Sequence, residues 1–262
     1  MPLRRPLYVA ANGTPTMIAA PDTIDPAILP DGGPGASLHA AQQAISSLTQ
    51  QWRCNDAPGT TTLANTKGAA VLTAGSDVTL GTGGLLNDGA TSAFLGVGGT
   101  AGSTGGHENA SLWTAPGVLP TVATTPWSVE FLATPPQNST YYVAIGGTSA
   151  ANVLLGTNAT SIYYGVNAAN AGSGTGAYNG GVGGRAQLIQ LTWDGTTLRL
   201  YVNGTLTTFS STAVIAMTGL VQFGCGYAGA GGNPLMRVQN IAIYSAALTQ
   251  TQIFANVAAA LL

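Results

Sequence analysis

The sequence predicts an all-β protein, an antiparallel jelly-roll sandwich, on the strength of three observations. Apolar residues alternate with other residues from Gln187 to Trp193 and again from Leu198 to Val202. Asp194-Gly195 and Asn203-Gly204 interrupt this alternation, and both dipeptides tolerate the positive φ of a two-residue hairpin turn. Short segments of similar character recur along most of the chain. Together these features indicate an antiparallel meander within a two-sheet sandwich.

The recurring segments are separated by Gly, Asn and Pro at near-regular spacing, which is typical of a sandwich or jelly roll rather than of βαβ units. The strands that we expect are 50–54, 68–73, 92–97, 127–133, 140–146, 153–157, 161–166, 186–193, 197–204, 206–211, 219–226 and 236–245. We expect the glycine-rich stretch 171–184 to be a loop.

The N-terminal region divides into an arm, 1–36, and a helix, 37–50, ahead of a β-domain over 51–262. Seven prolines in the arm rule out regular structure over most of its length. Ser37 is the expected N-cap of the helix. Its apolar stripe suits two arrangements, a helix lying on its own domain or a short bundle between copies of the chain. The stripe consists of Leu38, Ala41, Ile45 and Leu48.

A second short helix is expected at the C-terminal end. Thr249 and Gln252 have the spacing of a capping box. Ile253, Val257 and Leu261 follow at intervals of four residues, so one face of this helix should pack on the sandwich.

Composition excludes several classes of protein. The 262 residues include only 6% charged residues, so clustered basic residues for nucleic-acid binding are missing. No apolar run reaches the roughly 20 residues of a membrane-spanning helix, and we expect no membrane insertion and no signal peptide. Cys54 and Cys225 are either two buried thiols or a disulfide.

Several segments, in order along residues 49–262, resemble the laminin G-like domains of the concanavalin-type jelly-roll class. They are the opening QQWRCNDAPGTTTLANTKG, the strand WSVEFLA, the double hairpin QLIQLTWDGTTLRLYVNGT and the closing MRVQNIAIYSAALTQTQIFANV. The resemblance implies a lectin-like sandwich. It also implies calcium as the usual ion, for which Asn87 and Asp88 are the candidate ligands, although the same residues suit a tight turn. We otherwise expect no cofactor.

The arm resembles the short leaders of tailed-phage fibre and virion surface proteins, in which a hairpin with a central Asn-Gly precedes an acidic-threonine-hydrophobic segment. Tyr8, Asn12, Gly13 and the segment 22–24 carry this pattern. The resemblance implies a virion-surface protein made in the host cytoplasm. The residues expected to anchor it or to hold copies together, as a trimer, are Arg4, Arg5, Leu7, Tyr8, Asn12, Gly13, Leu38, Ala41, Ile45 and Leu48.

The residues for catalysis are missing from the sequence. A glycosidase needs paired carboxylates, and the two glutamates, Glu108 and Glu130, have no alternating acidic partner on a strand. His39 and His107 have no nucleophile motif nearby. We therefore expect no enzymatic activity.

Glycan binding needs an aromatic platform with amides nearby, although each such aromatic residue also suits the sandwich core. The candidates are Tyr163, Tyr164, Asn167, Tyr178, Asn179 and Tyr227.

The function that we expect is a phage structural protein (capsid decoration or a tail or head fibre) that displays a lectin-like domain to host-surface glycans. The alternative is a bacterial carbohydrate-binding adhesin module without a virion role.

Overall fold

The computed structural model describes residues 7–9, 15–17, 38–86, 90–96, 111–115, 117–136, 143–145, 153–157, 162–166, 176–178, 185–210, 221–224 and 235–261. The chain divides into two compact units, residues 1–36 and 37–262. In the first unit, β1 (Leu7–Val9) pairs antiparallel with β2 (Pro15–Met17), with Leu7 opposite Met17. The arm therefore contains a short hairpin.

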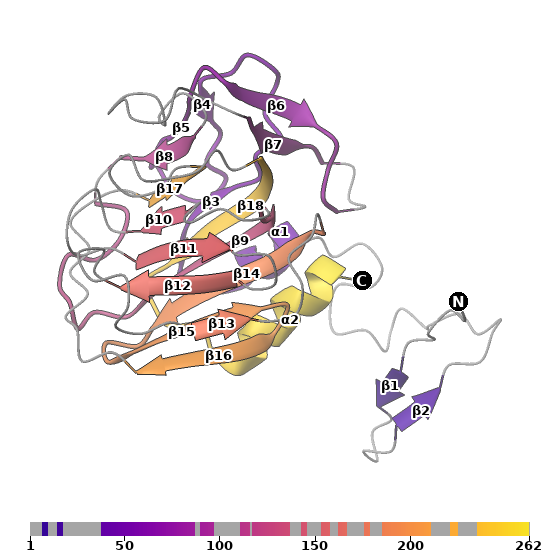
Figure 1. The fold of residues 1–262 in the computed structure, drawn as a ribbon, viewed down its shortest axis with the longest axis vertical. Coiled ribbons are helices and arrows are strands. Elements are labelled where there is room, and N and C mark those ends of the chain that lie inside the picture. Colours follow the sequence, from indigo (N-terminus) through magenta and orange to yellow (C-terminus); the bar gives the residue numbers. More distant parts are fainter. Residues whose placement is uncertain are drawn as a thin grey trace. The chain divides into compact units, whose positions relative to one another are not determined.

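The second unit contains two eight-stranded antiparallel sheets (Figure 1). The front sheet has the order β13-β12-β11-β10-β17-β8-β5-β4. In chain order its strands are β4 (Thr62–Leu63), β5 (Leu72–Ala74), β8 (Leu112–Thr114), β10 (Val143–Ile145), β11 (Val153–Thr157), β12 (Ile162–Val166), β13 (Gly176–Tyr178) and β17 (Val221–Phe223).

The back sheet has the order β16-β15-β14-β9-β18-β7-β6, and its eighth strand, β3, pairs with β18 alongside β7. Its strands are β3 (Leu48–Trp52), β6 (Val78–Thr82), β7 (Ser92–Leu95), β9 (Trp127–Thr134), β14 (Gln187–Trp193), β15 (Thr197–Val202), β16 (Thr205–Ser210) and β18 (Met236–Tyr244). β18 is central: it pairs with β9 on one side and with β3 and β7 on the other. The predicted fold class, an antiparallel two-sheet sandwich with two short helices, is confirmed.

One hydrophobic core fills the space between the sheets. Leu72, Leu112 and Val143 come from the front sheet, and Val129 and Leu191 come from the back sheet. Phe131 and Phe223 meet across this space edge to face, with ring centroids 5.0 Å apart. Apolar burial of this extent is the main force that holds the two sheets together.

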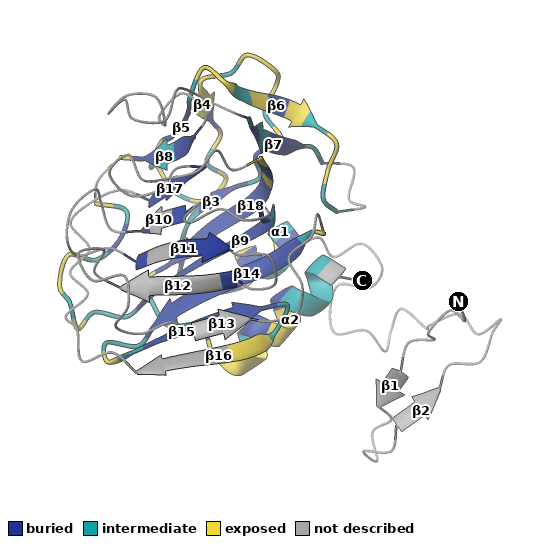
Figure 2. Ribbon diagram, in the orientation of Figure 1, coloured by how far each residue is buried: buried dark blue, intermediate teal, exposed yellow. Residues whose placement is uncertain are grey.

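Two helices cover the outer face of the back sheet: α1 (Leu38–Gln43) and α2 (Gln250–Leu261). Leu38 of α1 packs against Leu132 and Leu188 of the sheet, with Val257 of α2 beside them. Every residue of β14 is therefore buried, on both faces of the strand (Figure 2). In a sheet with one face in solvent, buried and exposed residues would alternate along the strand. The described part of the domain has three layers: helices, back sheet and front sheet.

Both predicted hairpins form, and the turn at Asn203-Gly204 is confirmed. Val202 pairs with Thr205, and Asn203 and Gly204 between them both have positive φ, 50° and 78°, as in a type I′ turn. The other hairpin also forms, but its turn is shifted by one residue from the predicted Asp194-Gly195. The Asp194 amide N–H donates to the Thr197 carbonyl oxygen at 3.3 Å, so the two loop residues are Gly195, with a positive φ of 97°, and Thr196. The capping box is confirmed as well: the Gln252 amide N–H donates to Thr249 Oγ1, and the Thr249 amide N–H donates to Gln252 Oε1.

The extent of the first helix was predicted wrongly. The helix ends at Gln43, and residues 48–52 form strand β3, because this segment pairs with β18 along the edge of the back sheet. The expected loop 171–184 was also wrong in part, since Gly176–Tyr178 forms edge strand β13. The predicted strands also omitted β4, β6 and β8, which are short.

Cys54 is a free, buried thiol, and burial raises its pKa, so that it stays protonated. Cys225 lies outside the described residues. In the part of the chain that the structure describes, neither helix has the length and apolar character needed to cross a membrane.

Candidate functional site

The front sheet presents polar and aromatic residues on the face turned away from the core. Leu112 and Phe223 are paired and point into the core. Because side chains alternate across a strand, their neighbours Trp113 and Gln222, which also pair with each other, occupy the opposite face. Trp113 is half-buried and does not belong to a core cluster.

Direct pairing extends this position into a row across neighbouring strands. Thr73 pairs with Trp113, and Thr62 pairs with Thr73. We call Thr62, Thr73, Trp113 and Gln222 the outer row. On the far side of Gln222, the register continues the row through Ala144 of β10.

The outer row combines one aromatic ring with an amide and two hydroxyl groups. Thr62 is exposed, Thr73 is half-buried, and Gln222 is 8% exposed. Gln222 Nε2 donates to Ser111 Oγ at 3.2 Å, which fixes the orientation of the amide beside Trp113. An indole face can stack on the C–H face of a sugar, and amide and hydroxyl groups can exchange hydrogen bonds with sugar hydroxyls.

Trp113 was not among the predicted site residues, because its strand is only three residues long. The signal was present in Leu112-Trp113-Thr114, where a tryptophan stands between two residues that are buried. Such a triplet is too short for its periodicity to be distinguished from a loop.

The predicted tyrosines lie at the β12–β13 edge of the front sheet. Tyr163 and Tyr164 belong to β12 and Tyr178 belongs to β13, where the backbone register pairs it with Ile162. The side chains of these three tyrosines lie outside the described part of the structure. Asn167, Asn179 and Tyr227 lie outside the described residues.

The other predicted site residues are separated in the structure or lie outside the described part. Leu38, Ile45 and Leu48 are buried in clusters of their own domain, and Ala41 is half-buried. They do not form one helical stripe, because Leu48 is in a strand. In the arm, Leu7 and Tyr8 belong to β1, whereas Arg4, Arg5, Asn12 and Gly13 lie outside the described residues.

The calcium candidates Asn87 and Asp88 lie outside the described residues as well. Across the described ranges, His, Cys, Asp and Glu side chains form no group of three or more that could hold a metal ion.

A second polar constellation lies beneath the helices, around Glu130 of β9. This carboxylate is fully buried and accepts hydrogen bonds from four uncharged side chains. Gln42 Nε2 donates at 2.7 Å, Gln190 Nε2 at 2.6 Å and Tyr244 Oη at 3.3 Å, and Asn256 Nδ2 reaches both carboxylate oxygens, at 3.1 and 2.9 Å. These donors come from α1, β14, β18 and α2.

Burial raises the pKa of Glu130, and the four hydrogen bonds offset this effect only in part. Burial and the Glu130 carboxylate likewise raise the pKa of Tyr244. A raised carboxyl pKa is typical of a general acid, but Glu130 is fully buried, and the side chains that donate to it in the described part of the chain are amides and a phenol. Its contacts join α1 and α2 to three strands of the back sheet, so its role is to hold these elements together.

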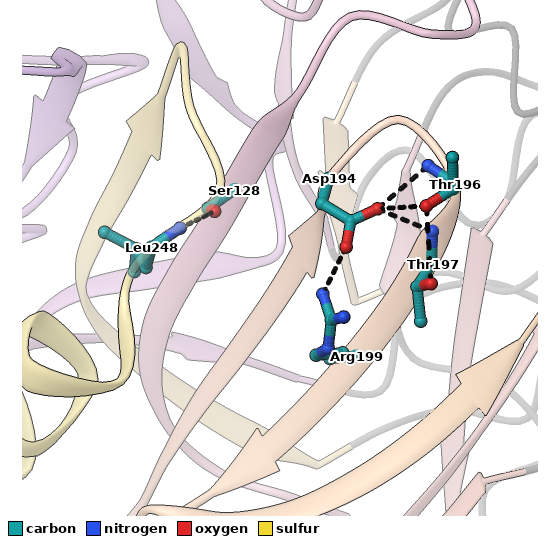
Figure 3. A network of polar contacts seen from close by, with 6 residues as sticks. All are labelled: Ser128, Asp194, Thr196, Thr197, Arg199 and Leu248. Atoms are coloured by element: carbon teal, nitrogen blue, oxygen red, sulfur yellow. Dashed lines mark hydrogen bonds and ion pairs between the residues drawn. The ribbon is translucent and has the colours of Figure 1, made fainter.

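The carboxylate of Asp194 makes its hydrogen bonds within its own hairpin turn (Figure 3). Its Oδ1 accepts from the Thr196 and Thr197 amides at 2.9 and 2.7 Å, and its Oδ2 pairs with Arg199 at 2.6 Å. Partial burial would raise the pKa of Asp194, but these hydrogen bonds hold it well below its usual range. The Asp194 carboxylate is therefore fully engaged by contacts within the hairpin.

Figure 3 also shows Ser128, whose hydroxyl accepts a hydrogen bond from the Leu248 amide at 3.0 Å and so fixes the segment that leads into α2.

Comparison with known proteins identifies the fold. No family model and no curated protein matches the chain. Among solved structures, one of botulinum neurotoxin type C superposes with a TM-score of 0.62 at 12% identity, over 86% of this chain and 53% of that one. Its description states that cell entry of that toxin depends on interaction with two ganglioside molecules. The serotype D ligand-binding domain in complex with N-acetylneuraminic acid gives 0.59 at 14%, over 83% and 52%. The binding domain of Paraclostridial Mosquitocidal Protein 1 gives 0.56 at 11%, over 83% and 52%.

This chain thus spans about half the length of those toxin binding domains, and at such low identity the likeness concerns the fold alone. The chain has the lectin-like β-sandwich fold that toxin receptor-binding domains contain.

Proposed function

We propose that residues 37–262 are a non-catalytic carbohydrate-binding module whose contact surface is the outer row of the front sheet. The observation that carries the proposal is Trp113, a half-buried indole on a sheet face away from the core, beside an amide held by Ser111. Stacking aromatic residues and fixed amides are what sugar recognition requires. The likeness to a toxin binding domain that was solved with N-acetylneuraminic acid supports the same class of function.

Binding to an array of immobilised glycans tests the proposal. The full chain should bind at least one glycan, and Trp113→Ala should weaken the binding by about tenfold or more, because the stacking surface is lost. Phe254→Ala is the matched control, since this aromatic residue is 49% exposed on α2, in the layer behind the other sheet. Equal loss of binding in both variants, or binding to no glycan, would contradict the proposal.

We also propose that residues 1–36 attach this module to a larger assembly, and that the assembly is a virion. The division of the chain into two compact units supports the separation of attachment from glycan binding. The phage-like pattern of the arm favours a virion over a bacterial surface protein, with other virion proteins and further copies of the chain as partners. Gold-labelled antibody against this chain should decorate intact phage particles. Labelling of bacterial envelopes alone would favour the adhesin alternative.

A further inference from the structure

We infer that the outer row selects neutral oligosaccharides over anionic ones such as sialylated glycans. This inference rests on the proposed function and names its ligand class. Its starting point is the charge pattern of the front sheet: none of the eight strands contains Asp, Glu, Lys or Arg.

Long stretches of the sequence around these strands also contain almost no charged residues. Between Glu108 and Arg185 the only charged residue is Glu130, which is buried beneath the helices. The stretch 200–236 contains none. These ranges hold six of the eight front-sheet strands: β8, β10, β11, β12, β13 and β17. The segment 185–199 between the two ranges forms β14 and the start of β15 in the back sheet and contains Arg185, Asp194 and Arg199.

The other charged residues that the structure describes lie outside the front-sheet strands. Arg53, Asp77 and Arg185, the last two of them exposed, flank strands β3, β6 and β14 of the back sheet. Arg199 is paired with Asp194 on the back-sheet hairpin, and Arg237 belongs to β18 of the back sheet. Near the front sheet, Asp56 accepts from the Ala64 amide at 2.8 Å beside the edge strand β4. Lys67 follows that strand in the turn organised by Asn65. Asp56 and Lys67 have opposite signs, so this edge has no excess of positive charge.

Recognition of a carboxylate ligand relies on Arg or Lys, or on free backbone N–H groups such as those at a helix N-terminus. The front sheet provides neither: it has no basic side chain, and its inner strands pair on both sides, so that their N–H groups belong to the ladder. A sialic acid carboxylate placed on the outer row would lose its hydration without gaining a charged partner, which is costly. A neutral sugar loses only hydroxyl hydration, which the amide and hydroxyl groups of the row can replace.

The dimensions of the row favour an oligosaccharide over a single sugar. Thr62, Thr73, Trp113 and Gln222 stand on four adjacent strands. With neighbouring strands about 4.8 Å apart, the row is roughly 14 Å long. This length exceeds one pyranose ring, so that Trp113 can hold one sugar while the threonines meet the next.

The test uses the full chain and pairs of immobilised oligosaccharides, each neutral glycan beside its sialylated derivative. We expect at least one neutral glycan to bind about tenfold more tightly than its sialylated partner. We expect its Kd to change less than about twofold between low and high salt, because no ion pair is there to be screened. Tighter binding of sialylated glycans, weakened by salt, would overturn the inference while leaving the proposed function intact. Absence of binding to any member would instead refute the proposed function.

Three variants of the outer row and one control variant locate the binding. Trp113→Phe keeps an aromatic face and should retain neutral-glycan binding, whereas Trp113→Ala and Gln222→Ala should lose about tenfold, with unchanged far-UV circular dichroism. Phe254→Ala should bind normally. Neutral-glycan binding that persists in both Trp113→Ala and Gln222→Ala would place the site elsewhere and overturn the inference.

Discussion

Glu130 is the residue whose environment differs most from what its sequence context indicates. In WSVEFLA, Glu130 stands between apolar residues. It shares one face of the strand with Ser128, and the sequence does not indicate which side chains pack against that face. The structure surrounds it with donors from four elements. Two buried amide oxygens of this group, Gln190 Oε1 and Asn256 Oδ1, have no hydrogen-bond partner in the described part of the chain. A protonated Glu130 would have these acceptors within its own cluster.

This arrangement predicts a pH dependence of stability. A carboxyl whose pKa is raised in the folded state binds its proton more tightly there than in the unfolded chain. Its contribution to stability is therefore complete below the unfolded value, about pH 4.5, and declines as pH rises through the folded value. Wild type should thus lose stability relative to Glu130→Gln as pH rises above that point, by at most about 1.4 kcal/mol per pH unit.

Urea unfolding of both proteins from acid to mildly alkaline pH measures this difference, and the contributions of all other groups cancel in it. Parallel stability curves would show that Glu130 titrates in the folded protein as it does in the unfolded chain. Glu130→Ala serves as the disruptive variant. It leaves several buried donors without an acceptor and should cost about 2–4 kcal/mol at any pH.

Among the elements, the β14–β15 hairpin was predicted most completely from sequence, because its alternation and turn residues specify the same structure. The chain before β3 shows the opposite case. SLHAAQQAISSLTQ has helical spacing throughout, yet Gln50 and Gln51 enter a strand, since pairing with β18 and the bonds of Gln51 to Gln42 and His39 favour it. Tertiary partners decide such a segment, and a single sequence does not reveal them.

The turn of this hairpin offers a test of backbone constraint. A Cβ added at Gly195 would lie 2.5 Å from the Thr124 carbonyl oxygen, and its φ of 97° is already unfavourable for an L-residue. Gly195→Ala should therefore lower the free energy of unfolding by about 2–4 kcal/mol.

Gly59→Ala is the matched control, with a φ of 83° and no atom within 4 Å of the added Cβ. It carries the conformational cost alone, about 1 kcal/mol. Thermal melts of both variants give the comparison. An equal loss of stability would mean that the contact with Thr124 imposes no constraint.

For the molecule as a whole, the sandwich could be predicted but its candidate site could not. Fold class follows from local patterns of alternation and turns. The outer row depends on which short strands become neighbours. β4 and β5 follow each other in the chain, but β8 and β17 come from parts far from them and from each other. The tyrosines were chosen by residue type, and Tyr163, Tyr164 and Tyr178 belong to β12 and β13, at the opposite end of the front sheet from β4.

The division into two units predicts that the domain folds without its arm. A chain beginning at Ser37 retains α1, α2 and both sheets. It should therefore melt cooperatively at nearly the temperature of the full chain and should still bind glycans. Differential scanning calorimetry makes the measurement. Loss of the cooperative transition would show that residues 1–36 contribute to the core, and the attachment proposal would then fail.

The position of β18 has a consequence for biosynthesis. Met236–Tyr244 is the last of the domain's described strands to be synthesised, and yet it forms the middle of the back sheet, between β9 and the pair β3 and β7. During translation these three strands expose unpaired edges of the kind that aggregate. Folding of the nascent domain must wait for the final strand, so its yield in a cell should depend on chaperones that shield the growing chain until synthesis passes Tyr244.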